Sequence, residues 1–342
     1  MALFTRYQSV MEQVDILLPL RDAERTLDQA IESIVRQTFP GWKLLLINNG
    51  SSDGGPTIAE RWAAQDARIN VIHEPIIGIA HALNTGLRGG VAPLIARMDA
   101  DDIAHPQRLE KQLAYLQAHP EIGVLGTRTR FETSVEKSSG MAWFVRWQNT
   151  ILTAHDHYVK RFVDAPLAHP TVMFRRSVIA AHGAYNTGPL PEDHELWLRW
   201  MGAGVRFAKL PEELLTWTDH KDRLSRTHSN YRVEAFFTTK AKWLAQWLSQ
   251  ELEGRKVIIA GTSGLCQARV ALLEAEGVRV DAFTDVQRHE VQDYTFIPPN
   301  ELPAPGEAVI ISFISQRGTG DRIAEYLASR GLVEGEDFIL AA

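Results

Sequence analysis

The sequence predicts an α/β protein with a large, mostly parallel sheet and flanking helices, followed by a helical connector and a smaller α/β domain. Two observations predict this fold class. Short apolar runs alternate with amphipathic stretches over residues 14–99, which is typical of strand–helix repeats with a parallel sheet. The same alternation restarts near residue 255. We therefore expect a first domain at 1–225, a connector at 226–253 and a second domain at 254–342.

The elements of the first domain follow from the spacing of apolar residues. The run VDILLPL indicates a buried strand, and the next segment carries Leu27, Ile31 and Ile34 at helical spacing. A second apolar run closes in Asn and Gly, which is a strand-to-turn signal. The expected strands are 14–20, 42–50, 69–74 and 92–99, and the expected helices are 25–38, 56–65, 78–90 and 106–119.

The pattern is less regular from residue 103 to residue 225. A helix is expected at 194–204, where Trp197 and Trp200 are spaced to face a core. A long helical stretch follows at 231–254. Beyond it, a strand, a glycine turn, a helix and a strand are expected from residue 256, and the same theme recurs at 307–332.

Composition narrows the classes of function. The chain has 342 residues and a net charge of −6, which argues against a general nucleic-acid binder. Cys266 is the only cysteine, so neither an internal disulfide nor a thiolate zinc site is expected. The first twenty residues lack the apolar core of a signal peptide, and no apolar run is long enough to span a membrane. We expect a cytoplasmic protein, with peripheral contact to the inner face of the membrane left open.

Three carboxylates fall within four residues of the segment IARMDADD, directly behind an apolar run. Asp99, Asp101 and Asp102 repel one another and are costly to bury, so they indicate either a solvated turn or a divalent-cation site. Mg²⁺ takes one or two protein carboxylates and completes its shell with phosphate and water. An EF-hand is excluded, because Ile103 and Ala104 occupy positions that need an oxygen ligand and a glycine.

Polar residues also end the second apolar run, in NNGSSDGG from Asn48 to Gly55. Amide and hydroxyl groups beside glycines suit hydrogen bonds to a base and a ribose, and they equally suit a plain polar turn. Ligands of parallel sheets bind beyond the carboxyl ends of the strands. We therefore expect this segment and the three carboxylates at the same edge of the sheet.

Further candidate groups follow later in the chain. Glu192 and Asp193 precede an amphipathic helix, where acids either favour the helix start or act as a general base. Arg223 and Arg226 suit a diphosphate clamp, and they also suit an ordinary charged surface. His169 fits a packed or capping role more readily than a chemical one.

In this order the motifs resemble the family 2 nucleotide-sugar glycosyltransferases, which have the GT-A fold. The resembling segments span roughly residues 12 to 230 and are VDILLPLRDAERTLDQAIESIVRQTF, NNGSSD, ALNTGLRGG, LIARMDADDIAHPQRLEKQ, AHPTVMFRR and PEDHELWLRW. The resemblance implies a metal-dependent, inverting transfer of sugar from a nucleoside-diphosphate sugar to a hydroxyl of a glycan or lipid-linked saccharide. It implies a role in surface-polysaccharide biosynthesis and a divalent cofactor, Mn²⁺ or Mg²⁺, at DADD.

The resemblance also implies roles at matching positions. Asp101 is the expected direct metal ligand, Asp99 lies near the metal and the donor ribose, and Asp102 supports the site. Asp193 is the expected base that deprotonates the acceptor hydroxyl. The expected nucleoside pocket is lined by Pro19, Arg21, Asn49 and Asp53, and the supporting candidates are Glu192, His169, Arg223 and Arg226.

One position departs from the family pattern. Asn48 and Asn49 stand where the family commonly has a pair of aspartates. A neutral amide makes a weaker and less selective contact with the ring N–H of uracil than a carboxylate makes. The sequence therefore does not single out UDP as the donor nucleotide.

The C-terminal domain resembles a Rossmann-like nucleotide fingerprint, with VIIAGTSGLCQ followed by Asp285. Gly261 and Gly264 do not complete the motif G-x-G-x-x-G, and Gln267 stands where a third glycine would aid helix packing. We expect a small Rossmann-like accessory domain that is structural, oligomerising or regulatory, with dinucleotide binding as an alternative.

Two rival functions stay open. A sugar-phosphate nucleotidyltransferase would share the sheet and the metal, but it needs a Gly- and Arg/Lys-rich phosphate loop that LPLRDAERT lacks. A non-catalytic nucleotide-sugar-binding regulator would keep Asp101 and tolerate the loss of Asp193. The expected partners are the nucleotide-sugar donor and the saccharide acceptor, with homo-oligomerisation open and no nucleic acid.

Overall fold

The computed structural model describes residues 14–136, 138–221, 223–252, 254–287, 291–316 and 318–342. The N-terminal segment considered above for targeting therefore lies mostly outside the described residues. Within the described part, no helix combines the length and the apolar character that a membrane crossing requires.

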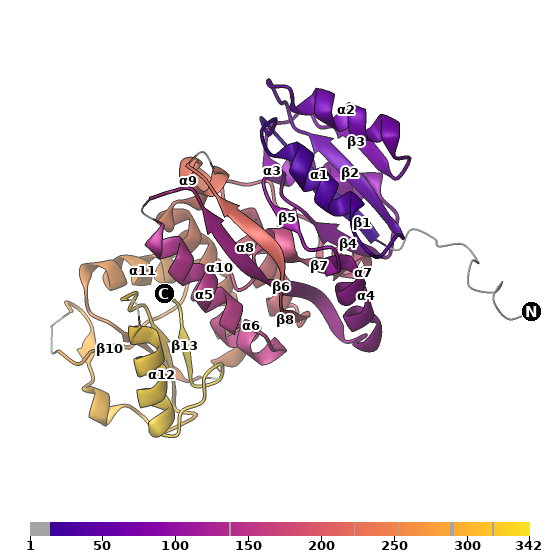
Figure 1. Ribbon diagram of the computed structural model, residues 1–342. Helices are drawn as coiled ribbons and strands as arrows, with labels where there is room; N and C mark the ends of the chain where they lie inside the picture. Colours follow the sequence, from indigo (N-terminus) through magenta and orange to yellow (C-terminus); the bar gives the residue numbers. More distant parts are fainter. Residues whose placement is uncertain (1–13, 137, 222, 253, 288–290, 317) are drawn as a thin grey trace, which may run out of the picture. The chain divides into compact units, whose positions relative to one another are not determined.

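The chain divides into two compact units (Figure 1). The first unit consists of residues 1–154, 167–188 and 203–226, and the second consists of residues 155–166, 189–202 and 227–342. Each domain expected from the sequence was one continuous stretch of chain. In the structure, each compact unit is built from three separate stretches.

The first unit contains an eight-stranded sheet with the order β3-β2-β1-β4-β7-β6-β8-β5. Strand β1 (Val14–Leu20) pairs in parallel with β2 (Trp42–Asn48) and with β4 (Leu94–Arg97), and β2 pairs in parallel with β3 (Ile69–His73). Leu20 lies in register with Asn48, so the polar segment after β2 begins at the edge where β1 ends. The mostly parallel sheet expected from the sequence is confirmed.

Helices cover both faces of these parallel strands. Helices α1 (Leu27–Val35), α2 (Gly55–Gln65) and α4 (Arg108–Ala118) share one hydrophobic core with inward residues of β1, β2 and β4. Helix α3 (Ile79–Gly89) covers the opposite face. Gly86 of α3 lies so close to the sheet that a Cβ there would sit 2.9 Å from the Ile47 side chain.

The other half of this sheet departs from the parallel pattern. Strand β7 (Met173–Arg175) runs antiparallel to β4 and to β6 (Ile122–Thr133). Strand β8 (Arg206–Asp219) pairs in parallel with β6 and antiparallel with β5 (Ile103–Ala104). The remaining elements here are α5 (Ser139–Thr150), the 3₁₀ helix η1 (His169–Thr171), α7 (Arg176–His182) and α9 (Leu224–Thr227).

The second unit contains a five-stranded, wholly parallel sheet with the order β11-β10-β9-β12-β13. Its strands are β9 (Lys256–Ala260), β10 (Ala282–Thr284), β11 (Thr295–Phe296), β12 (Ala308–Ser312) and β13 (Phe338–Leu340). This arrangement is the second parallel α/β unit that the sequence predicts.

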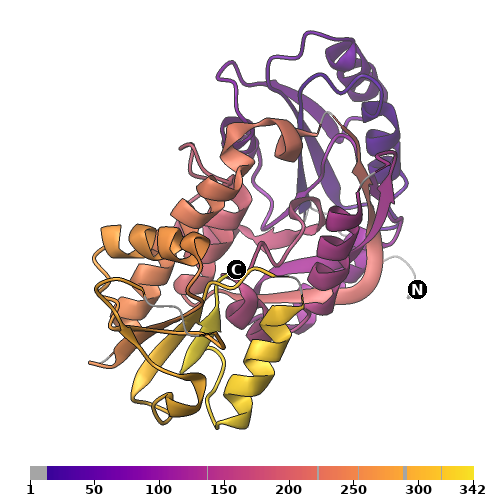
Figure 2. The same cartoon turned by 90° about the vertical axis from the view of Figure 1, so that its left-hand side faces the viewer.

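Helices also cover both faces of the second sheet. Helices α10 (Val233–Glu251) and α11 (Gly264–Ala275) pack on one face, and α12 (Thr319–Ser329) packs on the other (Figure 2). Trp197 and Trp200 are fully buried in α8, as predicted. The unit also contains α6 (Ala154–Lys160), α8 (Glu192–Gly202) and the 3₁₀ helices η2 (Ser229–Tyr231) and η3 (Pro299–Glu301).

Candidate functional site

An acidic cluster lies in the turn between β4 and β5, beyond the carboxyl end of β4. Asp99, Asp101 and Asp102 each offer a carboxylate oxygen, and these oxygens all lie within 4.8 Å of one another. Asp99 and Asp101 are partly exposed, whereas Asp102 is buried. The backbone turn thus brings together the three carboxylates that the sequence singles out.

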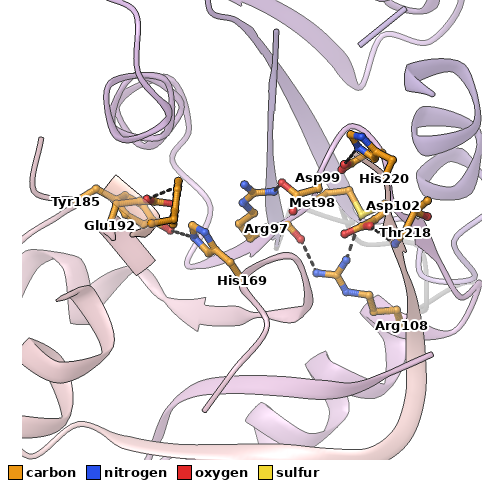
Figure 3. Close-up of polar contacts among 12 residues, drawn as sticks. Arg97, Met98, Asp99, Asp102, Arg108, His169, Tyr185, Glu192, Thr218 and His220 are labelled. Carbon is orange, nitrogen blue, oxygen red and sulfur yellow. Dashed lines mark hydrogen bonds and ion pairs between the residues drawn. The ribbon is translucent and has the colours of Figure 1, made fainter. Parts of the chain in front are cut away.

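Different neighbours hold the two C-terminal carboxylates of this acidic cluster (Figure 3). The Asp101 carboxylate lies 2.8 Å from Nε2 of His220, and Oδ1 of Asp102 accepts a 2.9 Å hydrogen bond from the backbone N–H of Thr218. Oδ2 of Asp102 is buried, and it has no hydrogen-bond partner in the described part of the chain. Both partners lie at the end of β8 or just beyond it, so β8 shapes this turn.

The acids differ in their tendency to ionise. Burial, followed by the charges of Asp99 and Asp101, raises the pKa of Asp102 well above its usual value. Burial also raises the pKa of Asp101, but the hydrogen bond from His220 and the charge of Arg223 outweigh this effect and lower its pKa overall. Asp101 is therefore an anion at neutral pH.

Two buried guanidinium groups lie beneath the acidic cluster. Arg97, the last residue of β4, forms an ion pair with Asp99, although its side chain is only 1% exposed. Arg108, at the start of α4, is fully buried and donates a 2.6 Å hydrogen bond to the Arg97 carbonyl oxygen. Burial lowers the pKa of Arg108 to about 9, while the charge of Asp102 acts in the opposite direction. These arginines offset part of the negative charge.

This donor set fits a hard divalent cation. Carboxylate oxygens are the ligands that Mg²⁺ and Mn²⁺ prefer, and one buried carboxylate oxygen here has no partner. The partly exposed Asp99 and Asp101 could hold such a cation while leaving room for phosphate oxygens. Asp102 is tied to Thr218 and is better placed to support the turn.

Asn49 anchors the loop that follows β3. Its Nδ2 donates hydrogen bonds of 3.0 Å to the Glu74 carbonyl oxygen and 2.8 Å to that of Ile76, and its Oδ1 accepts one of 2.8 Å from Gly78 N–H. Both donor hydrogens of this buried amide are therefore used inside the protein. Its expected contact with a nucleoside stays a prediction, and the structure gives Asn49 a positioning role instead.

Replacing Asn49 by aspartate is expected to lower the free energy of unfolding by about 2–3 kcal/mol, because a carboxylate cannot donate to the two carbonyl oxygens it would face. Urea denaturation followed by circular dichroism measures this loss. The control is Asn186→Asp, because Asn186 is exposed and its Oδ1 accepts a hydrogen bond from Gly188 N–H, which aspartate can also accept. Equal stability of Asn49→Asp and the control would contradict the assignment.

The loops after β1 and β2 are bonded to each other. Asp53 Oδ2 accepts a 2.7 Å hydrogen bond from Glu24 N–H, and Asp22 Oδ1 accepts bonds of 2.7 and 2.9 Å from the N–H and hydroxyl of Ser52. Asp22 has φ +51°, a rare conformation for a residue with a side chain, and these bonds compensate for it. Asp53 therefore links the loop after β2 to the loop after β1, and its contact with a nucleoside stays a prediction.

The other expected donor-site residues are distributed along the same edge. Pro19 is partly buried within β1, and Arg21, which directly follows this strand, is exposed. The Arg223 guanidinium lies 4.1 Å above the Trp217 ring, and its charge acts on Asp101 and on Asp102. Arg226 instead forms two hydrogen bonds, of 2.9 and 2.6 Å, with the buried Asp219.

His169 is buried beside Arg97 and lies 2.9 Å from the Tyr185 hydroxyl (Figure 3). Burial and then the charge of Arg97 hold the pKa of His169 well below its usual range, so the ring is neutral. The backbone of Tyr185 is held in turn by the Asn84 side chain, through bonds of 2.9 and 3.1 Å. His169 is therefore a packed, neutral histidine, and its supporting role at the site stays a prediction.

Glu192 and Asp193 begin α8 and belong to the second compact unit, whereas the acidic cluster belongs to the first. Glu192 is buried, and its Oε2 accepts a 2.6 Å hydrogen bond from the Tyr231 hydroxyl. Asp193 is partly exposed, and its Oδ1 accepts a 2.7 Å bond from His194 N–H. Of the two acids, Asp193 is the one with access to solvent.

Four contributors were missed by the sequence analysis, namely Arg97, Arg108, His220 and Tyr231. Arg97 and Arg108 flank the acidic motif, and a basic residue next to an apolar strand could have signalled a buried charge pair. No local signal marks His220 or Tyr231, because each meets its acidic partner only through the fold.

Comparison with known sequences identifies relatives of one kind. The family model described as "Glycosyl transferase family 2" matches residues 15–183. The amylovoran biosynthesis glycosyltransferase AmsE of Erwinia amylovora is 31% identical, over 58% of this chain and 74% of AmsE. The putative glycosyltransferase EpsE of Bacillus subtilis is also 31% identical, over 65% of this chain and 78% of EpsE.

Solved structures share the fold at low sequence identity. Residues 1–349 of S. aureus TarS in complex with UDP-GlcNAc superpose with a TM-score of 0.53 and 14% identity, over 77% of this chain and 71% of that one. The mannosyltransferase PcManGT of Pyrobaculum calidifontis, in complex with GDP-Man and Mn²⁺, gives a TM-score of 0.50 and 17% identity. The match covers 78% of this chain and 73% of PcManGT.

Proposed function

Because the chain belongs to glycosyltransferase family 2, we propose that it transfers a sugar from a nucleoside-diphosphate sugar to a hydroxyl group of a glycan or lipid-linked saccharide. The proposal includes inversion at the anomeric carbon and a place in surface-polysaccharide biosynthesis. The observation that carries it is the acidic cluster at the carboxyl end of β4, whose three carboxylates bring oxygens within 4.8 Å of one another. The ligands of the TarS and PcManGT complexes support the donor class, and the name of AmsE supports the pathway class.

Asp99 and Asp101 would hold the divalent cation, with Asp102 supporting the turn from below. Such a cation, when bound, offsets the negative charge that develops on the departing diphosphate. Arg97 keeps Asp99 in place through their buried ion pair. Arg223, whose charge already acts on Asp101, is the candidate side chain for the diphosphate itself.

The proposed chemistry at the acceptor is a single displacement. The Asp193 carboxylate takes the proton of the acceptor hydroxyl, whose oxygen forms a bond to the anomeric carbon. The bond between that carbon and the diphosphate oxygen breaks, and its electron pair leaves with the nucleoside diphosphate. Because attack and departure occur on opposite faces, the anomeric configuration inverts.

We propose that the nucleoside lies over the bonded loops after β1 and β2, with Arg21 and Pro19 at its side. Asp53 and Asn49 would act mainly by positioning these loops, since their polar atoms are already engaged. A base would then be recognised by backbone groups and by the loop that Asn49 anchors. This arrangement leaves the identity of the nucleotide to experiment.

A nucleotide panel tests the donor class. UDP, dTDP, GDP and CDP are each added to the full chain with Mn²⁺ or with EDTA, and the melting temperature is recorded. A ligand at 100 times its Kd adds about 2.7 kcal/mol of stability. For a unit of this size, that corresponds to a shift of roughly 5–10 °C. We expect one nucleotide to give this shift with Mn²⁺ and a much smaller one with EDTA.

Two results would count against the proposal. A chain that no nucleotide stabilises under either condition does not have the proposed donor site. A chain that binds a nucleotide sugar but releases no nucleoside diphosphate with any saccharide acceptor is a regulator rather than a transferase. Inversion is tested separately, by NMR of the product's anomeric proton.

A further inference from the structure

The sheet of the second unit contains a topological switch point. From β9 the chain proceeds to β10 and β11 on one side, and it then returns to build β12 and β13 on the other side. The helix after β9 and the helix after β12 consequently lie on opposite faces (Figure 2). In open parallel sheets, ligands bind beyond the carboxyl ends of the two strands that flank this point.

Among the residues that the structure describes, three buried polar groups near this edge have no hydrogen-bond partner. They are Oγ1 of Thr284, Oγ of Ser312 and Nε of Arg269, and these residues are only 4%, 2% and 5% exposed. A buried polar atom without a partner costs free energy, and the cost is largest for a charged group. These three groups near one edge are therefore candidates for contacts with a ligand.

Strand register places the two hydroxyl groups in one row. Thr284 and Ser312 both lie opposite Ala260, one from each neighbouring strand, so the three side chains share a face at the carboxyl ends of the strands. Leu340 continues the row on β13, and Gly320 of α12 lies against it, because a Cβ there would be 3.4 Å from Leu340 Cδ1. The first turn of α12 thus lies close to the Ser312 strand.

The two helices that begin at this edge differ in their N-terminal capping. The Ser263 hydroxyl caps α11 by accepting a hydrogen bond from Cys266 N–H. Helix α12 begins after Gly318, at φ +74°, and no side chain of the described residues caps it. Its first N–H groups suit an anion, as at other glycine-preceded helix starts. The exposed Asp321 lies in the first turn of α12 and competes with an anion for the same helix end.

Arg269 supplies a positive charge at the same edge. Helical side chains point toward the N-terminus of their helix, and Nη1 of Arg269 donates a 2.5 Å hydrogen bond to the carbonyl oxygen of Phe313, the residue after β12. Its guanidinium also stacks 3.8 Å from the ring centroid of Phe237. Within the described part of the chain, no carboxylate forms an ion pair with it, and its burial lowers its pKa.

We propose that the carboxyl edge of β9 and β12 binds the phosphate group of a small phosphorylated ligand, such as a nucleotide. Arg269 supplies the countercharge, and the Ser312 hydroxyl and the first N–H groups of α12 supply hydrogen bonds. Thr284 lies two strands away and contacts the remainder of the ligand. The site lies wholly within the second unit, so it is distinct from the donor site and does not depend on the proposed transferase chemistry.

Hydrogen exchange on the full chain tests this site. Inorganic phosphate, ADP and UDP are added separately, in EDTA, which suppresses binding at the acidic cluster. We expect slower exchange in peptides that contain the segments following β9 and β12. If inorganic phosphate is sufficient to slow exchange, the site binds a free anion. If only ADP or UDP slows exchange, the site binds a nucleotide. Both results support the proposal.

Two variants and a matched control sharpen the test. Arg269→Gln removes the charge and Ser312→Ala removes the hydroxyl, and each is expected to weaken binding at least tenfold. Arg279→Gln makes the same change in charge at an exposed position just before β10, at the opposite edge of the sheet, and should bind as wild type does. If Arg269→Gln folds poorly, Ser312→Ala decides the question. Protection confined to the first unit, no protection with any probe, or undiminished binding in Ser312→Ala would overturn the proposal.

Discussion

Asp101→Asn is expected to reduce sugar transfer at least about a hundredfold, because it removes the negative charge of the proposed metal ligand. The substitution keeps the size of the side chain and an oxygen that His220 can still meet. The turn between β4 and β5 should therefore stay folded. The measurement is the initial rate of nucleoside diphosphate release at saturating Mn²⁺, with the donor identified by the nucleotide panel.

The control for this substitution is Asp28→Asn, which removes one charge from an exposed position of α1 and should leave the rate unchanged. A loss of Mn²⁺-dependent nucleotide binding in Asp101→Asn should accompany the loss of turnover. If the variant turns over normally, or binds nucleotide as tightly with Mn²⁺ as wild type does, then Asp101 does not hold the cation.

Sequence pattern was sufficient for the parallel half of the first unit. Strands β1 to β3 and helices α1 to α4 lie within a few residues of the expected ranges. Each of these elements is locally consistent, with apolar runs for buried strands and 3.6-residue spacing for helices. Parallel strands also need crossover helices, so alternation along the chain largely determines their arrangement.

The helices α4 and α8 between residues 103 and 225 were expected, but the long strands of this region could not be predicted in the same way. Strand β6 ends in TRTRFET and β8 contains KLPEEL, and neither has the continuous apolar run of a central strand. Their pairing joins residues about 85 positions apart, with register shifts near Thr127 and Arg128. Such long-range pairing has no signature in a local window of sequence.

The functional site was predictable where its residues are adjacent in sequence. The three carboxylates of the acidic cluster were identified from one turn, and they do converge. Asn49 shows the limit of this approach, because a residue type that suits base recognition is used here to anchor a neighbouring loop. Whether a polar side chain is free for a ligand depends on partners that only the fold brings near it.

Asp193→Asn is expected to lower the turnover number by about 10²- to 10⁴-fold, the usual contribution of a general base. Asparagine keeps an oxygen that can accept the hydrogen bond from His194 N–H, so the start of α8 should be preserved. It cannot take a proton from the acceptor hydroxyl. Donor affinity should change by no more than a few-fold, because the donor is proposed to bind at the acidic cluster of the first unit.

Glu192→Gln provides the comparison for the base assignment. Glu192 is buried and accepts a hydrogen bond from the Tyr231 hydroxyl, which glutamine can also accept. We therefore expect this neighbouring substitution to retain most of the transferase rate. Turnover that survives in Asp193→Asn but is lost in Glu192→Gln would transfer the role of base to Glu192. Turnover that survives in both would mean that neither acid deprotonates the acceptor, and the displacement would then need another base.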